Sequence, residues 1–195
     1  MILRPIDRRR ELEALLKPPS GPGVYVDFAI SLALKHAWRV NRSTDAGPAH
    51  ASWRADYWVH TMYVHPLDSD EAFAAYLHEA GHLEDPLLPE RPRSHEQPSD
   101  SMASIEAEVF AWLFAITCAG YRWNRAMQAT LEKSLATYVS FVDTFEEGGY
   151  HQRCLLNAVI NHGREQARHI VRTLGTPAPP ISPLLAEFYQ QVSLT

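Results

Sequence analysis

The order of apolar and polar positions along the chain predicts a mostly helical protein. Long stretches free of helix breakers alternate with segments rich in proline, glycine or polar residues. We expect helices over residues 8–16, 24–40, 101–119, 125–145, 151–174 and 183–192, the second of them with a strand-like start. Connecting segments are expected over residues 17–23, 41–51 and 86–99. The last of these is long enough to border or cover a cleft.

A strand followed by a further helix is predicted in the middle of the chain. Residues 57–64 are rich in β-branched and aromatic side chains, which favour a strand whose exposed edge could pair with an extended peptide. After them, Asp68 and Glu71 resemble a capping box, and Pro86 marks the end of the helix. The expected fold is therefore mainly α, of the α+β type, with a small β-sheet preceding this helix.

This helix carries an H-E-x-x-H sequence, His78-Glu79-Ala80-Gly81-His82. Histidines four positions apart lie about 40° apart on one helix face, so both imidazoles can reach one divalent metal ion. Glu79 falls at the edge of that face, where a carboxylate can hold or deprotonate a water molecule on the metal. The alternative is a pair of histidines in a core or on a solvated face, without a metal.

A catalytic metal site of this kind needs a third protein ligand, usually a carboxylate from a second helix. The predicted helix over residues 101–119 offers Glu106 and Glu108, which project about 200° apart, so at most one of them can face the metal. Glu108 shares its face with three alanines, which would allow this helix to lie close to the first. Glu106 shares its face with bulkier apolar residues. We therefore prefer Glu108 as the third ligand and keep Glu106 as the alternative.

The two histidines with a glutamate on a later helix resemble the gluzincin metallopeptidases. One branch of that group, the ImmA/IrrE-like proteins, has an E-x-x-A-x-x-F-A pattern on the glutamate helix. Here that pattern corresponds to Glu108, Ala111, Phe114 and Ala115. The same branch has a glycine between the two histidines, which Gly81 matches. The resemblance covers about residues 57–120.

This resemblance implies a zincin-like helical domain that binds zinc and cleaves a peptide or protein substrate. His78, His82 and Glu108 would bind the zinc ion, and Glu79 would act as the general base. Trp112 stands where these families often have an aspartate or asparagine that supports a ligand histidine. The residue that would stabilise an oxyanion is not identified by the sequence.

A second resemblance leads to an iron enzyme. Residues 112–114 and 119–124 are similar to the segment after the metal motif in the bacterial elongation factor P hydroxylases, and residues 175–177 and 184–189 are similar to the tail of that family. This implies ferrous iron and an oxygen-dependent hydroxylation of a protein side chain. Two histidines and one carboxylate suit either metal.

Three functional hypotheses follow from the sequence. The first is a zinc metallopeptidase. The second is a non-haem iron oxygenase or hydroxylase that modifies a protein or peptide side chain. The third is a binding module in which the metal has a structural or sensing role.

Outside the motif, a few polar residues are candidates for supporting roles. Asp85 could be the partner of a ligand imidazole. His162 and His169 are seven positions apart on one late helix, and one of them could stabilise an oxyanion, although a surface or core role is the simpler interpretation.

Composition narrows the functional classes. The chain has 195 residues, 46% of them hydrophobic, and we expect a single domain over residues 1–195. The net charge of −5 gives no electrostatic footprint for nucleic acid. No apolar run approaches the ~20 residues that span a bilayer, and an apolar signal region is not found at the start. With two cysteines, interpreted as free buried thiols, we expect a cytoplasmic protein. Its oligomeric state is left open.

Overall fold

The structure is a computed structural model in which most of the chain folds into helices. It describes residues 5–19, 25–42, 54–56, 61–86, 102–143, 149–172 and 179–193. The helices are α1 (Pro5–Leu16), α2 (Val26–Lys35), α4 (Asp70–Leu83), α5 (Met102–Ala119), the 3-10 turn η4 (Gly120–Arg122), α6 (Arg125–Val142), α7 (Tyr150–Arg172) and α8 (Pro183–Ser193). The strands are β1 (Arg39–Arg42), β2 (Arg54–Asp56) and β3 (Thr61–Val64). A mainly α fold with a small sheet before the H-E-x-x-H helix is thus confirmed.

The sheet has the order β1-β3-β2, with β3 in the centre. β1 runs parallel to β3, pairing Arg39 with Thr61, and β2 runs antiparallel to it, pairing Arg54 with Tyr63. The prediction that this strand exposes an edge to a peptide is therefore wrong for residues 61–64, because both of its edges are already paired. The first half of the predicted strand, residues 57–60, lies outside the described residues.

The prediction of one helix over residues 24–40 is also wrong, because helix α2 stops at Lys35 and a strand follows it. Ala37 has a left-handed backbone with φ of 57°. The amide of Trp38 donates to the carbonyl of Ala33, and the amide of Ala37 donates to that of Leu34, which is the Schellman pattern of a helix end. Glycine usually marks such an end, and its absence here removed the sequence signal.

Helix α4 begins one residue later than the capping box predicted. Ser69, in an extended conformation, is the N-cap, and its hydroxyl accepts a hydrogen bond from the amide of Ala72 at 3.1 Å. Asp68 is therefore not the cap. The helix ends at Leu83, shortly before Pro86, as expected. The predicted connecting segment over residues 86–99 lies, beyond Pro86, outside the described residues.

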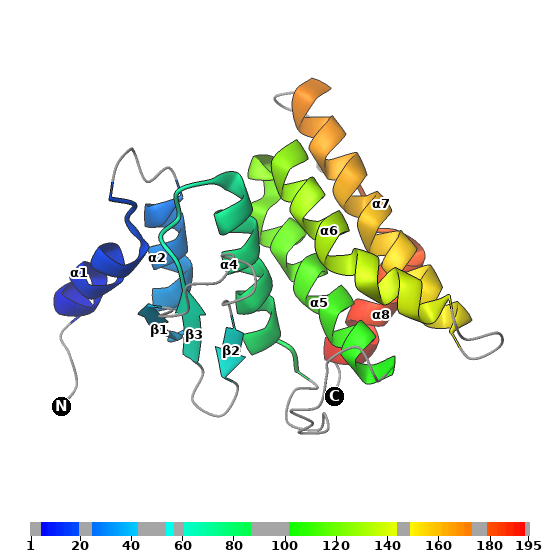
Figure 1. Ribbon diagram of the computed structural model, residues 1–195, viewed down its shortest axis with the longest axis horizontal. Helices are drawn as coiled ribbons and strands as arrows, with labels where there is room; N and C mark the ends of the chain where they lie inside the picture. The colour runs from blue at the N-terminus through cyan, green and yellow to red at the C-terminus, as the bar shows by residue number, and fades with distance from the viewer. Residues whose placement is uncertain are drawn as a thin grey trace.

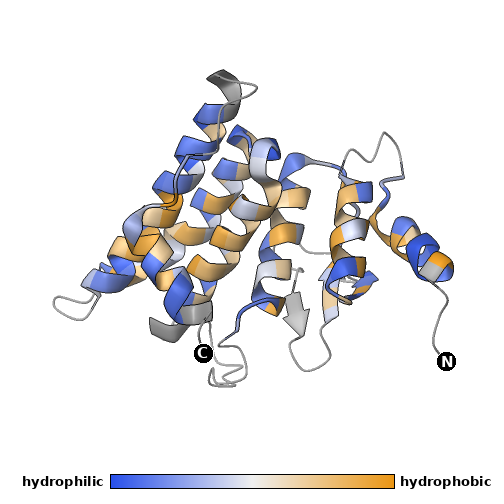
Figure 2. Cartoon of the chain, turned by 180° about the vertical axis from the view of Figure 1, so that it is seen from behind, coloured by the Kyte–Doolittle hydropathy of each residue, from blue (hydrophilic) through white to orange (hydrophobic). Residues whose placement is uncertain are grey.

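Helix α4 occupies the middle of the molecule (Figure 1). The sheet and α2 lie on one side of it, and α5 and α6 lie on the other. Almost every residue from Ala72 to Leu83 is buried. Figure 2 shows the consequence for hydropathy, since the middle helices are mostly apolar and the outer helices carry the polar residues.

The three helices after Gly120, α6, α7 and α8, follow the prediction closely. Gly120 has a φ of 52°, the left-handed conformation expected at the end of α5. Asn124 then caps α6, accepting hydrogen bonds from the amides of Ala126 and Met127, and its side-chain amide donates to Asp70 of α4 at 2.8 Å. The buried apolar side chains form one cluster that extends from Leu12 on α1 to Phe188 on α8. Within the described residues, no helix is long and apolar enough to cross a membrane.

Candidate metal centre

Helices α4 and α5 bring the side chains of His78, His82 and Glu108 to one point. The Nε2 atoms of the two histidines are 3.1 Å apart, and each lies 3.4 Å from an oxygen of the Glu108 carboxylate. Ligand atoms that surround a tetrahedral zinc ion at about 2.0–2.1 Å are about 3.3 Å from one another. The two histidines contact different oxygens of Glu108, Oε2 for His78 and Oε1 for His82, so two nitrogens and one carboxylate lie close enough together to share a metal ion.

The close packing of the two helices makes this convergence possible. A Cβ atom on Gly81 would lie 2.6 Å from the Cα of Ala111 and 2.7 Å from its carbonyl oxygen. Only a glycine allows α4 to touch the backbone of α5 in this way. Glu108 lies one turn before Ala111, so the contact brings its carboxylate within reach of the histidines. The small-residue packing expected from the sequence is confirmed.

The two glutamates of α5 have different surroundings. The carboxylate of Glu108 contacts both histidines, whereas that of Glu106 accepts a hydrogen bond from Gln152 of α7 at 3.4 Å. Helical geometry separates them, as the spacing of two positions required. Of the two candidates for a third ligand, Glu108 is the one that lies beside the histidines.

Burial and charge act against each other in this cluster, where His78 and His82 are each 8% exposed. Burial lowers the pKa of His78 to about 3, although the Glu108 carboxylate partly opposes this. Burial also acts to lower the pKa of His82, but the charges of Glu108, Glu79 and Asp85 outweigh it, so the pKa of His82 is raised. The two facing Nε2 atoms have room for only one proton between them, which makes the pair a ready acceptor for a cation.

Glu108 is held by a residue that the sequence did not reveal. Burial acts to raise the pKa of its carboxyl group, but the two histidines and a hydrogen bond from Tyr138 lower that pKa to about 2. Tyr138 lies on α6, so three helices supply the cluster. Nothing in the local sequence around Tyr138 distinguishes it from a packing residue, because its role depends on a contact between distant helices.

An aromatic ring covers one of the two histidines. The Trp112 ring stacks on the imidazole of His78, with centroids 4.3 Å apart and planes 26° apart. His78 Nδ1 and Trp112 Nε1 are both buried and have no hydrogen-bond partner within the described part of the chain. Asp85, which is 3% exposed, acts on His82 through its charge. The two histidines thus differ, since an acidic residue supports one and an indole ring covers the other.

The other candidates lie elsewhere. His162 is 7% exposed and lines a separate cavity of about 130 Å³ together with Thr117 and Gln166. Neither His162 nor His169 belongs to the metal-type cluster, which consists of His78, His82 and Glu108 among the described residues. Glu79 follows His78 on α4 and is partly exposed, unlike the buried histidines.

No protein-family model, curated protein or solved structure matches the chain. The resemblances to metallopeptidases and to iron hydroxylases therefore stay predictions. A metal centre is supported by the identity of the three donor residues, their proximity and their burial.

Proposed function

We propose that the chain is a metal-dependent hydrolase, a zinc metallopeptidase in which His78, His82 and Glu108 bind the metal. The observation that carries this proposal is the convergence of two imidazole nitrogens, 3.1 Å apart, on one carboxylate whose two oxygens each lie 3.4 Å from one of them. Three protein ligands with one position left open are typical of catalytic zinc sites, whereas structural sites have four. We favour a catalytic role over a structural or sensing role for this reason.

Each residue around the cluster has a separate task in this proposal. A bound zinc ion would supply a Lewis acid that polarises a carbonyl group and lowers the pKa of water toward ~7. Glu79 takes a proton from the attacking water and passes it to the leaving amine. Its position supports this task, because it is partly exposed and its charge reaches His82. Tyr138 holds Glu108 in place through its hydrogen bond.

The substrate in this proposal is a peptide or protein in the cytoplasm. The two cysteines, Cys118 and Cys154, are free thiols, which are usual in proteins of that reducing compartment. A net charge of −5 supports a protein substrate over a nucleic acid, because polyanions bind to basic surfaces.

The substitution Glu79→Gln tests the hydrolytic mechanism. A general base contributes about 10²–10⁴-fold to a rate, so we expect cleavage of a mixture of quenched fluorescent peptides to fall by that factor. Zinc content and melting temperature should stay unchanged. Glu71→Gln, at an exposed position in the first turn of α4, is the matched control and should retain full activity. Activity retained in Glu79→Gln would refute the role of Glu79 as base.

A non-haem iron oxygenase is the second candidate, because the same two-histidine, one-carboxylate set binds ferrous iron. The Trp112 ring over His78 keeps this candidate open, since the acceptor that supports a ligand histidine in zinc peptidases is missing there. Metal analysis of protein purified without added metal, with an anaerobic sample in parallel, separates the two. One zinc ion per chain supports the hydrolase. Bound ferrous iron with oxygen consumption would overturn it in favour of an enzyme that modifies a protein or peptide side chain.

A further inference from the structure

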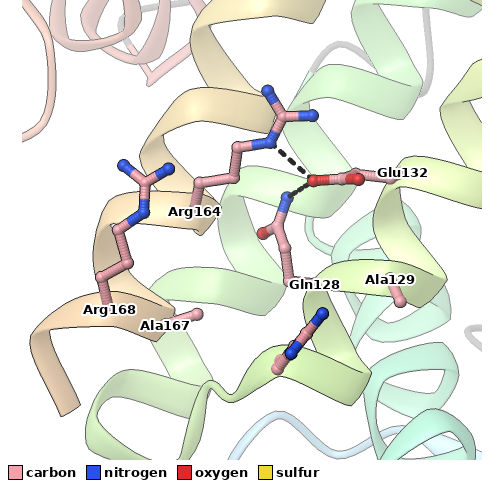
Figure 3. A pocket seen from close by; sticks show the side chains of 7 residues that line it. Gln128, Ala129, Glu132, Arg164, Ala167 and Arg168 are labelled. Atoms are coloured by element: carbon pink, nitrogen blue, oxygen red, sulfur yellow. Dashed lines mark hydrogen bonds and ion pairs between the residues drawn. The ribbon is translucent and has the colours of Figure 1, made fainter. Parts of the chain in front are cut away.

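A groove of about 650 Å³ runs between α6 and α7, away from the histidine cluster (Figure 3). Its charged lining consists of three arginines, Arg125, Arg164 and Arg168, and one carboxylate, Glu132. Two positive charges are therefore in excess here, although the whole chain has a net charge of −5. The volume is within the range of small-molecule sites, about 300–1,000 Å³.

The carboxylate in the groove is paired with one of the arginines. Glu132 accepts a hydrogen bond from Arg164 Nε at 2.7 Å, and this contact is drawn in Figure 3. Among the described residues, Arg125 and Arg168 have no hydrogen bond or ion pair. The excess charge of the groove therefore belongs to these two exposed guanidinium groups.

Arg125 stands where a positive charge is unfavourable, because it is the first residue of α6, next to the positive end of the helix dipole. Arg168 lies four positions after Arg164 on α7, and since Arg164 is paired with Glu132, the charge of Arg168 is not balanced by that carboxylate. An anion in the groove would be attracted to both exposed arginines.

The floor of the groove is rigid, which distinguishes it from an ordinary charged surface. Gln128, 6% exposed, donates from Nε2 to Glu132 at 2.9 Å and to the carbonyl of Ile160 at 3.2 Å. Its Oε1 accepts from Trp123 Nε1 at 3.2 Å. Gly163 of α7 leaves the space for this amide, since a Cβ there would lie 2.2 Å from Gln128 Oε1. The base of the groove is thus held by hydrogen bonds, and the exposed Arg125 and Arg168 lie at its sides.

We propose that the groove between α6 and α7 binds a multiply charged anionic ligand, through phosphate or carboxylate groups held by Arg125 and Arg168. Guanidinium groups bind the oxygens of both kinds of anion in a bidentate manner. Such a ligand would neutralise the excess positive charge of the groove. This proposal is independent of the metal centre and of its reaction.

Inorganic pyrophosphate and citrate are the probes, measured by titration calorimetry and by thermal unfolding with sodium chloride at matched ionic strength. We expect saturable binding of at least one probe and a rise in melting temperature that sodium chloride does not produce. Binding of pyrophosphate alone assigns the site to phosphates, and binding of citrate alone assigns it to carboxylates. Absence of saturable binding for both probes overturns the proposal.

The variants Arg125→Gln and Arg168→Gln locate the site. Loss of one charge-assisted hydrogen-bonding group should weaken binding by at least about tenfold. The melting temperature without ligand should change little, because both side chains are exposed and make no hydrogen bond or ion pair with the described residues. Arg10→Gln, at an exposed position on α1, changes the net charge equally and should bind like the wild type. If all three variants bind with equal affinity, the effect is general charge screening and the proposal is wrong.

Discussion

Buried polar groups are paired differently at two helix contacts of this molecule, the one between α4 and α5 and the one between α6 and α7. Between α4 and α5, three donor residues converge on one point, and among the described residues His78 Nδ1 and Trp112 Nε1 have no hydrogen-bond partner. Between α6 and α7, both ends of the Gln128 amide are hydrogen-bonded. An unpaired buried polar group costs about 1–3 kcal/mol. The contact between α6 and α7 therefore satisfies its buried amide, whereas the contact between α4 and α5 carries the cost of two unpaired polar atoms.

Each pair also contains a glycine, and the two glycines meet different neighbours. Gly81 faces the backbone of Ala111, whereas Gly163 faces the end of the Gln128 side chain. A backbone cannot move without shifting a helix, but a side chain can rotate. The spacing of α4 and α5, and with it the geometry of the cluster, thus depends on one residue.

The largest effect is expected on metal binding at the contact between α4 and α5. Glu108→Gln removes one of three ligands, so we expect affinity for zinc to fall by more than about 100-fold, beyond the 10–100-fold typical of an outer contact. Glu106→Gln is the same substitution two positions earlier, where the carboxylate contacts Gln152. Competition with a chromophoric chelator measures both. Equal losses in the two variants would contradict the site described above.

Adding a methyl group to each glycine tests the packing difference. Gly81→Ala should destabilise the fold by about 2 kcal/mol, since overpacking against a backbone costs about 1–3 kcal/mol. Gly163→Ala should destabilise the fold by about 1–2 kcal/mol, because a displaced Gln128 loses hydrogen bonds worth about 1 kcal/mol each and the gain in helix propensity offsets only part of that loss. Urea unfolding measures both. A greater loss in Gly163→Ala would mean that Gln128 is fixed more firmly than the backbone contact at Ala111.

Two buried tryptophans allow the same substitution in the satisfied and the unsatisfied region. Trp123 donates to Gln128, whereas the Nε1 of Trp112 has no partner. Both rings are 0–1% exposed, so replacement by phenylalanine removes a similar volume. Trp123→Phe should cost about 1–2 kcal/mol more than Trp112→Phe, because only it breaks a hydrogen bond. Equal costs in urea unfolding of the metal-free proteins would indicate that Trp112 also has a partner, such as a water molecule.

Local patterns were enough to predict the elements that carry the metal cluster. Helical spacing placed His78 and His82 on one face, and the alanine face of α5 favoured Glu108 over Glu106. The features that the sequence did not reveal depend on tertiary contacts. Ala37 adopts a left-handed backbone that glycine usually takes, stabilised by hydrogen bonds to the end of α2, with Trp38 in the core. Likewise, Tyr138 acquires its role only because α6 packs beside α4 and α5.

The smallest effect is expected at His162, which lines the cavity of about 130 Å³ and whose buried Nδ1 has no hydrogen-bond partner among the described residues. Burial lowers its pKa, and the charge of Glu165 only partly opposes this. The folded chain therefore takes up this proton at a lower pH than the unfolded chain, which takes it up below about pH 6.5, so stability falls as the pH decreases through that value.

His162→Gln should flatten this loss, making the decline between pH 7 and 5.5 smaller than in the wild type by up to about 1 kcal/mol. Urea unfolding at a series of pH values measures the difference, in which the other histidines cancel because both proteins contain them. His151→Gln, at an exposed position on the same helix, is the control. Parallel profiles for all three proteins would mean that water or another group already solvates His162. Unpaired buried polar atoms would then be found at the contact between α4 and α5 but not at His162.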